Sequence, residues 1–268
     1  MTLAVCATPI GNLDDVTLRV LHELAEADVV LCEDTRHTAV LLARHGIRAA
    51  ELRSYHRHNE AARTREVLER LRGGARIALV SDAGLPGIND PGMRLVAAVR
   101  EAGLDVTVLS GPSAVTTALV SSGFTAERYQ FLGFLPRGAT ALAALWEELA
   151  AWPHVAVAFE SPRRLPASLG SLAAAAPERP VAVCRELTKH FEEVVRGPAA
   201  DVAARFADPP RGEIVVVIGP WRGSPAPDDD AVAAVSELVL VGVPRRQAAE
   251  LVARLTGTSA RTLYRRSL

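Results

Sequence analysis

The chain is short of lysine, cysteine and aromatic residues. Lys189 is the single lysine among 268 residues, aromatic residues make up 4%, and the cysteines are Cys6, Cys32 and Cys184. These cysteines are far apart and each lies in an apolar stretch, which favours buried free thiols over disulfides or zinc ligands. Arginine carries almost all of the positive charge, which we attribute to coding bias rather than to phosphate binding throughout the chain.

Long apolar runs and a targeting segment are also missing. No apolar run approaches the roughly 20 residues of a membrane-spanning helix. The N-terminal segment MTLAVCATPIGN has no basic start and reaches glycine too early for a signal peptide, so we expect a cytoplasmic protein.

A strong overall charge is absent as well. The formal net charge is -1, whereas domains that hold nucleic acid by bulk electrostatics are usually strongly basic. The charge is unevenly distributed, because residues 231–268 contain six arginines and two glutamates and carry a net charge of +4. The C-terminal end is therefore the basic part of the chain.

Two common nucleotide-binding motifs do not occur. Neither GxGxxG nor GxxxxGKS/T is present, so motifs give no support for a dinucleotide fold or a P-loop. The sequence instead alternates strand-like and helical patterns, which predicts an α/β domain with a parallel sheet. The strand-like runs lie at residues 3–7, 28–32, 76–80 and 106–109, with helical patterns such as 16–27 and 63–71 between them.

Further strand-like runs predict a second α/β domain. They lie at residues 129–134, 155–159, 181–184, 192–195 and 214–218. We expect the domains to span 1–121 and 122–222, followed by a linker at 223–230 and a basic helical tail at 231–268. The helix-turn-helix spacing of the tail permits either a contact with nucleic acid or a plain pair of packed helices.

The segment IALVSDAGLPGINDPGMRLV, residues 77–96, is the most informative in the chain. Its apolar start predicts a buried strand, and the glycines and prolines that follow interrupt both strand and helix. The loop is about twice as long as most strand-to-helix connections. Because ligands of open α/β sheets bind at the carboxyl ends of strands, we interpret it as a ligand-binding loop rather than a connection alone.

Four other segments place small or polar residues near strand ends. ATPIGNLDDVTL is a ligand loop by position, and LSGPSAVTTAL offers backbone amides around Ser113, which is also a candidate helix N-cap. LCEDTRH places Glu33, Asp34 and Arg36 where they either face a crevice or cap a helix. YHRHNE holds two histidines one residue apart, but no third ligand follows at a clear spacing, so we predict no metal site.

Eight segments occur in an order that resembles one family. They lie between Thr8 and Glu193 and read TPIGNLDDVTLR, EDTRHT, YHRHNE, SDAGLPGINDPG, GPSAVTTAL, GFLPR, ESPRRL and RELTKHFEE. This set resembles the RsmI family of ribosomal RNA 2'-O-methyltransferases, in the tetrapyrrole methylase superfamily, and the basic tail is similar to the one many members carry. The chain departs from SDAGTPLISDPG at Leu85, Gly87 and Asn89, which a backbone-lined loop tolerates.

The resemblance implies two α/β domains of the tetrapyrrole methylase type, with S-adenosylmethionine bound in the cleft between them. It also implies a homodimer without a metal, which methylates a cytidine ribose in the decoding region of 16S ribosomal RNA within the small ribosomal subunit, leaving S-adenosylhomocysteine. By carry-over, the cofactor-binding residues are Pro9, Ile10, Asp82, Ala83, Gly84, Leu85, Ser113, Ala114 and Leu187.

Methylation of a ribose hydroxyl also needs residues that accept its proton and residues that bind the RNA. A base for the weakly acidic ribose hydroxyl is expected among Glu33, Asp34, His56, Glu60, Glu160 and Glu186, and the sequence does not choose between them. Groups that would hold phosphates or neighbouring nucleotides are Arg36, His58, Asn59, Arg137, Arg163, Arg164, Arg185 and Lys189.

Two other functions compete with RNA methylation. A tetrapyrrole methyltransferase on the same fold predicts a first loop closer to GxGPG and a second closer to GDP, where this sequence has TPIGN and SDAG. A basic tail would also serve a porphyrin substrate poorly. A noncatalytic RNA- or nucleotide-binding module ranks last, because it would not need so many polar strand ends.

Overall fold

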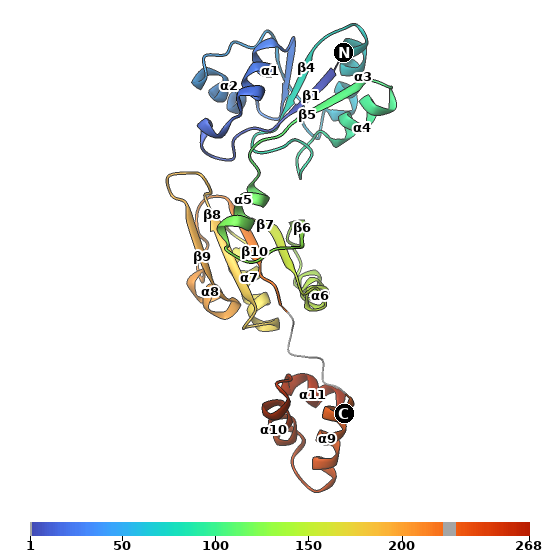
Figure 1. The fold of residues 1–268 in the computed structure, drawn as a ribbon, viewed down its shortest axis with the longest axis vertical. Coiled ribbons are helices and arrows are strands. Elements are labelled where there is room, and N and C mark those ends of the chain that lie inside the picture. Colours follow the sequence, from blue (N-terminus) through green and yellow to red (C-terminus); the bar gives the residue numbers. More distant parts are fainter. Residues whose placement is uncertain (1, 222–228) are drawn as a thin grey trace.

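The computed structural model describes residues 2–221 and 229–268. These residues form two five-stranded sheets, each packed against helices, and a C-terminal helical region (Figure 1). The expectation of an α/β chain with two sheets and a helical appendage is confirmed. Within the described ranges, no helix is both long and apolar enough to cross a membrane.

The first sheet is parallel throughout, as predicted, with the strand order β3-β2-β4-β1-β5. Three of its strands are continuous apolar runs because helices cover both faces. The sequence does not predict β3, whose three residues are only half-buried and show no apolar run. The strands are β1 (Thr2–Cys6), β2 (Val29–Cys32), β3 (Leu52–Ser54), β4 (Ile77–Val80) and β5 (Asp105–Leu109).

Two pairs of helices cover the faces of the first sheet. α1 (Leu18–Glu26) and α2 (Thr35–Arg44) pack on one face, and α3 (Glu60–Arg72) and α4 (Met93–Glu101) pack on the other. The side chains of β1 alternate between these two clusters, which is the period of a strand.

The start of the first helix differs from the prediction. Thr17 caps α1 by accepting a hydrogen bond from the Val20 N–H. Asp14 and Asp15, just before it, belong to a separate 3-10 helix, η1 (Leu13–Asp15), that Asn12 caps. α1 therefore begins two residues later than the apolar pattern indicates.

The second sheet is mixed, with the order β6-β7-β10-β8-β9. β6 and β7 are parallel, and the remaining pairs are antiparallel. All five predicted strands form, with ends shifted by at most a few residues. They are β6 (Tyr129–Phe134), β7 (Val155–Glu160), β8 (Pro180–Arg185), β9 (Glu193–Pro198) and β10 (Ile214–Ile218).

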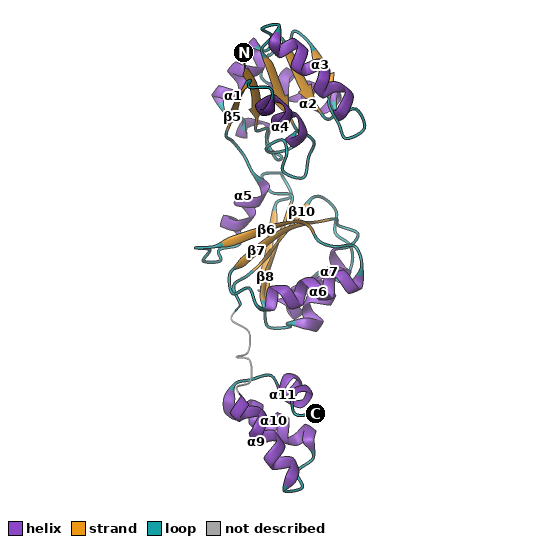
Figure 2. Cartoon of the chain, turned by 90° about the vertical axis from the view of Figure 1, so that its right-hand side faces the viewer, coloured by secondary structure: helices purple, strands orange, loops and turns teal. Residues whose placement is uncertain are grey.

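Helix α5 (Ala114–Ser121) links the two sheets. α6 (Ala139–Ala150), α7 (Leu165–Ala175) and α8 (Ala199–Arg205) cover one face of the second sheet, and α5 packs on the other (Figures 1 and 2). Val115 and Ala118 of α5 share a buried cluster with β7, β8 and β10. The proposed domain boundary at residue 121 assigns α5 to the first domain by sequence, whereas its packing is with the second sheet.

The tail is a packed group of helices set apart from both sheets (Figure 2). α9 (Asp229–Leu240), α10 (Arg245–Thr256) and α11 (Ala260–Arg266) share one small apolar cluster, and the turns between them contain Gly242 and Gly257, where the sequence predicts breaks. Residues 223–228 of the predicted linker lie outside the described residues. Its last two residues open α9, which corrects the predicted start of the tail.

Candidate functional site

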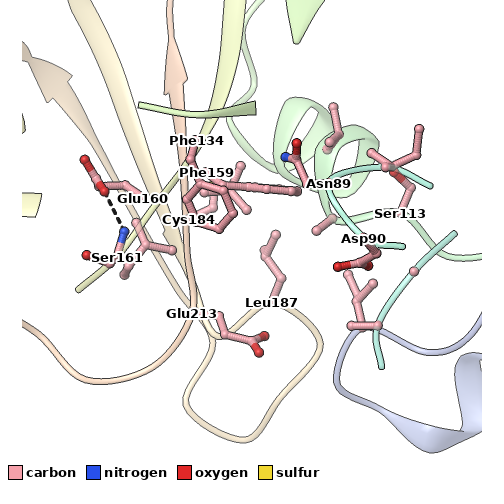
Figure 3. Close-up of a pocket in the computed structure, with 18 of the residues that line it drawn as sticks. Asn89, Asp90, Ser113, Phe134, Phe159, Glu160, Ser161, Cys184, Leu187 and Glu213 are labelled. Carbon is pink, nitrogen blue, oxygen red and sulfur yellow. Dashed lines mark hydrogen bonds between the residues drawn. The ribbon is translucent and has the colours of Figure 1, made fainter. Parts of the chain in front are cut away.

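A cavity of about 400 Å3 lies where the two sheets meet (Figure 3). Loops that follow β1, β4 and β5 form its wall on the side of the first sheet, and β7, β8 and β10 with their loops form the opposite wall. Most of its surface is apolar, with a few polar groups, among them Asn89, Asp90 and Glu213. This combination of size and lining is typical of small-molecule sites, which usually measure about 300–1,000 Å3.

The loop after β4 is fastened to the end of β1. Thr8 and Gly84 exchange two backbone hydrogen bonds of 2.8 and 3.0 Å, and the Thr8 hydroxyl donates to the Ser81 carbonyl at 2.9 Å. Gly84 has a φ of 76°, which glycine adopts without strain. The backbone of this loop is therefore held against the end of β1, on the side of the cavity formed by the first sheet.

The proposed cofactor residues fall into two neighbouring groups. Seven of the nine line the large cavity, namely Ile10, Ala83, Gly84, Leu85, Ser113, Ala114 and Leu187. Pro9 and Asp82 line a smaller adjoining cavity of about 130 Å3, which shares Ile10 and Ala83 with the large one. The Asp82 carboxylate accepts a hydrogen bond from the Asp34 N–H at 3.1 Å and lies 3.8 Å from Nδ1 of His37.

The first loop and the second domain meet at Gly11. A Cβ at this position would lie 2.5 Å from Cγ of Lys189 and 2.9 Å from the Leu187 carbonyl oxygen, so only glycine permits the approach. Next to it, the Asn12 N–H donates to the Thr188 hydroxyl at 3.0 Å. Leu187 packs in the same cluster as Ile10, and these contacts close one end of the cavity.

Four of the six candidate bases accept structural hydrogen bonds. Glu160 is buried, accepts hydrogen bonds from the Ser161 N–H at 2.6 Å and the Ser168 hydroxyl at 2.5 Å, and pairs with Arg164. Glu186 accepts from the Glu213 N–H and from Nζ of Lys189, both at 2.9 Å, and these contacts lower its pKa.

Glu60 is the third. Its Oε1 accepts from the Tyr55 hydroxyl at 3.2 Å and from the Gly92 N–H at 3.3 Å, which ties α3 to the loop after β4. This carboxylate therefore acts as a structural acceptor that joins two elements.

Asp34 is also committed to local structure. It caps α2 by accepting from the Arg36 N–H at 2.8 Å, and it forms a two-point ion pair with the Arg36 side chain. The Arg36 guanidinium holds the pKa of this carboxyl well below its usual range. The sequence left open whether the LCEDTRH residues face a crevice or cap a helix, and Asp34 caps a helix. Glu33 is half-buried and is not among the residues that line either cavity.

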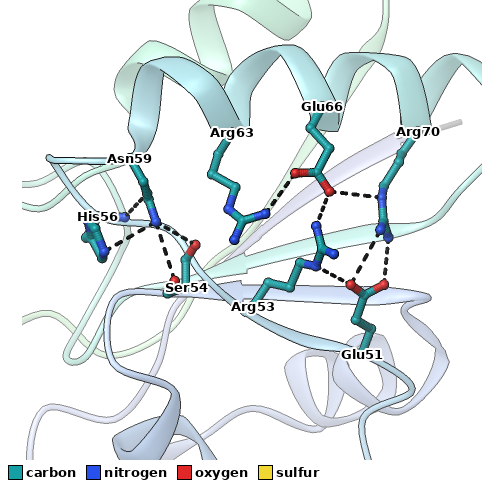
Figure 4. Close-up of polar contacts among 8 residues, drawn as sticks. All are labelled: Glu51, Arg53, Ser54, His56, Asn59, Arg63, Glu66 and Arg70. Atoms are coloured by element: carbon teal, nitrogen blue, oxygen red, sulfur yellow. Dashed lines mark hydrogen bonds and ion pairs between the residues drawn. The ribbon is translucent and has the colours of Figure 1, made fainter.

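The YHRHNE segment is built into the junction of β3 and α3 (Figure 4). The Asn59 amide donates to the Ser54 carbonyl at 3.1 Å and contacts Nε2 of His56, and its oxygen accepts from the His56 N–H. Beside it runs an ion-pair network of Glu51, Arg53, Arg63, Glu66 and Arg70. No three His, Cys, Asp or Glu side chains within the described ranges are grouped to hold a metal ion.

The eight proposed RNA-binding residues divide by exposure. Arg36, His58, Arg137 and Arg163 are exposed. Asn59 is held as described above, Arg164 donates to the Leu135 carbonyl and pairs with Glu160, Arg185 pairs with Glu193, and Lys189 bridges Glu186 and Glu213. These four residues are therefore engaged in contacts within the protein.

Sequence reasoning missed several residues of the cavity wall. Asn89 and Asp90 belong to the loop that was predicted to bind a ligand, so the signal was present in the same segment. Glu213 and Phe134 carry no comparable signal, since nothing local in the sequence places them opposite that loop. Nδ2 of Asn89 is buried and has no hydrogen-bond partner within the described part of the chain, which marks it as a donor toward the cavity.

Sequence comparison shows what this chain is related to. Residues 2–203 match the family described as Tetrapyrrole (Corrin/Porphyrin) Methylases. The chain is 43% identical to ribosomal RNA small subunit methyltransferase I of Mesorhizobium japonicum, over 99% of this chain and 91% of that protein. The protein of the same name from Synechocystis is 40% identical, over 99% and 97%. The chain belongs to this methyltransferase family.

Solved structures of other proteins share the fold at lower identity. Diphthine synthase superposes with a TM-score of 0.64 at 14% identity, covering 82% of this chain and 90% of that one. A uroporphyrin-III C-methyltransferase from Thermus thermophilus, complexed with S-adenosyl homocysteine, has a TM-score of 0.57 at 18% identity, covering 81% and 96%. The expected pair of α/β domains of the tetrapyrrole methylase type is thus confirmed.

Proposed function

We propose that this methyltransferase transfers the methyl group of S-adenosylmethionine to the ribose 2'-oxygen of a cytidine in the decoding region of 16S ribosomal RNA. The observation that carries the proposal is the shared cavity, in which seven residues that the resemblance assigns to the cofactor meet from both domains. The relatives at 40–43% identity, whose names specify small-subunit ribosomal RNA, support the substrate class.

The lining suits S-adenosylmethionine. Backbone of Ala83 to Leu85 and the apolar side chains of Ile10 and Leu187 would hold the adenosine and the methionine chain, and the buried Asn89 amide offers a donor to an acceptor atom. When bound, this cofactor supplies an electrophilic methyl group on a sulfonium. The protein's own contribution is to align the hydroxyl with that methyl group, to exclude water and to accept a proton.

A two-substrate assay tests the proposal. Purified protein is incubated with labelled S-adenosylmethionine and either small ribosomal subunits that lack the modification or a corrin precursor, and the labelled nucleotide is located by nuclease digestion and mass spectrometry. We expect label on one 2'-O-methylcytidine of the subunit and none on the corrin. Label on the corrin alone would establish the tetrapyrrole alternative, and label on a base rather than a ribose would refute the assigned acceptor.

The tail is proposed to add electrostatic affinity for RNA. Arg254, Arg261 and Arg265 are exposed on α10 and α11, and within the described part of the chain they form no ion pair, whereas Arg246 pairs with Glu250. Replacing all three by alanine should weaken binding to the small subunit and reduce its salt dependence, while cofactor affinity stays unchanged. The matched control replaces three exposed arginines of the first domain, Arg48, Arg65 and Arg72; equal weakening there would deny the tail a specific role.

Two further features are part of the proposal. The resemblance implies a homodimer, which sedimentation of the purified protein at several concentrations would test. A ribosomal substrate also implies the cytoplasm, which cell fractionation would test.

A further inference from the structure

Asp90 differs from three of the predicted bases, Glu60, Glu160 and Glu186, in the contacts of its carboxylate. It lines the cavity shared by the two domains, and Figure 3 shows its oxygens turned into that space, on the side of Leu187. No hydrogen bond or ion pair to Asp90 is formed by any side chain in the ranges 2–221 and 229–268. The carboxylates of Glu60, Glu160 and Glu186, in contrast, accept hydrogen bonds from protein donors.

The loop holds Asp90 in place through its neighbour Asn89. Nη2 of Arg57 donates to the Asn89 carbonyl at 2.9 Å, and Asn89 has a φ of 64°, in the left-handed region that asparagine tolerates better than most residues. On the other side, a Cβ at Gly133 of β6 would lie 3.2 Å from Oδ1 of Asn89. The Asn89 side chain therefore rests against the second sheet, and Asp90 follows at a fixed point of the cavity wall.

The surroundings of Asp90 make it more basic than an ordinary aspartate. Burial, followed by the nearby carboxylates of Glu33 and Asp82, raises the pKa of Asp90 from 3.8 to about 6, while Arg57 acts in the opposite direction. Such a group is mostly ionised at neutral pH and yet accepts a proton more readily than an exposed aspartate does. This balance is what general base catalysis near neutral pH requires.

Resting on the proposed function, we propose that Asp90 is the catalytic base that takes the proton of the attacking ribose 2'-hydroxyl. As the 2'-oxygen forms its bond to the methyl carbon, the bond between that carbon and sulfur breaks and its electron pair stays on the sulfur. The hydroxyl proton passes to an Asp90 oxygen and is later released to water. Asn89 is a positioning residue, because it fixes the loop against Gly133 while Asp90 faces the reacting hydroxyl.

The test compares Asp90→Asn with Glu33→Gln in the full-length protein. Single-turnover methylation of unmodified small ribosomal subunits is measured from pH 5 to pH 8, and the affinity for S-adenosylhomocysteine is measured by calorimetry. For the wild type we expect the rate to rise about tenfold per pH unit below a pH of about 6 and to level off above it. Asp90→Asn should lower the rate by about 10²- to 10⁴-fold and abolish this dependence, with cofactor affinity changed by less than about threefold.

Glu33→Gln keeps the inference testable even where Asp90→Asn fails to fold. It removes a neighbouring negative charge that raises the pKa of Asp90, so the rising limb of the pH profile should move to lower pH. A purely structural role of either residue would not move that limb.

Several results would overturn the assignment. An Asp90→Asn protein with the wild-type rate and pH profile, or a Glu33→Gln profile that does not move, would exclude Asp90 as the base. A loss of cofactor affinity of about tenfold or more, with an unchanged rate at saturation, would make Asp90 a cofactor ligand instead. If wild-type protein labels no ribosomal subunit, the proposed function fails and this inference fails with it, whereas a failure confined to the variants concerns Asp90 alone.

Discussion

Gly11→Ala probes whether the first loop and the second domain form one binding site. The new Cβ would lie 2.5 Å from Cγ of Lys189, 2.7 Å from the Thr188 hydroxyl oxygen and 2.9 Å from the Leu187 carbonyl oxygen. The Lys189 stem can rotate away, but the Leu187 oxygen is backbone and Thr188 is bonded to the Asn12 N–H. The two loops must therefore separate to admit the methyl group.

The size of the effect follows from this crowding. Forcing one extra methyl group into a tight contact costs about 1–3 kcal/mol. The protein can relieve this steric cost by moving the two loops apart. Binding of the cofactor against Leu187 would then have to bring the loops back together and supply the same free energy. At about 1.4 kcal/mol per factor of ten, the affinity for S-adenosylhomocysteine should fall roughly 5- to 150-fold.

Calorimetric titration with S-adenosylhomocysteine measures this loss. Gly138→Ala is the matched control, because a Cβ there meets no atom within 4 Å and its φ of -96° is open to any residue. The control should bind as the wild type does. Wild-type affinity in a folded Gly11→Ala protein would refute the reasoning, since it would mean that the contact at Gly11 has no part in closing the cavity.

Three other predictions concern buried ionisable side chains. Arg179→Met should lower the free energy of unfolding by about 3 kcal/mol, measured by urea titration with tryptophan fluorescence, because Arg179 donates to the carbonyls of Leu149, Trp152 and Gly219. Glu160→Gln should cost about 2 kcal/mol in the same titration, and a variant as stable as the wild type would contradict the buried hydrogen bonds assigned to it. A thiol reagent at pH 8 should leave the native protein unlabelled and modify all three cysteines in denaturant, because burial raises the pKa to about 12 for Cys6, about 11 for Cys32 and about 12 for Cys184.

Much of the fold could be predicted from the sequence because most strands are continuous apolar runs. β4 and β10 coincide with such runs, and helices cover both faces of their sheets. β3 has no such signature, since Leu52 to Ser54 are half-buried and paired on one side only. The packing of α5 on the second sheet could not be predicted either, because an apolar helix face does not specify which of two sheets it covers.

The sequence predicted only part of the candidate site, because several of its contacts depend on the order of the strands. Glu33 and Asp82 are close to Asp90 because β2 and β4 are parallel neighbours, and their carboxyl ends therefore lie together. Strand order is a property of the whole sheet, so the sequence supplied the polar strand ends but not this cluster. Likewise, nothing local indicated that Glu160 would be buried among Ser161, Ser168 and Arg164 rather than exposed to a substrate.

Hydrogen bonding separates the carboxylates of this protein into two groups. Some of them fasten one element to another, as Glu60 does when it accepts hydrogen bonds from the Tyr55 hydroxyl and the Gly92 N–H. Asp90, in contrast, forms no hydrogen bond or ion pair with another side chain in the ranges 2–221 and 229–268, and burial followed by nearby carboxylates raises its pKa to about 6. If both proposals hold, the loop after β4 would contact the cofactor through its backbone at Ala83 to Leu85 and present Asp90 as the proton acceptor, so one segment would position both the methyl donor and the base.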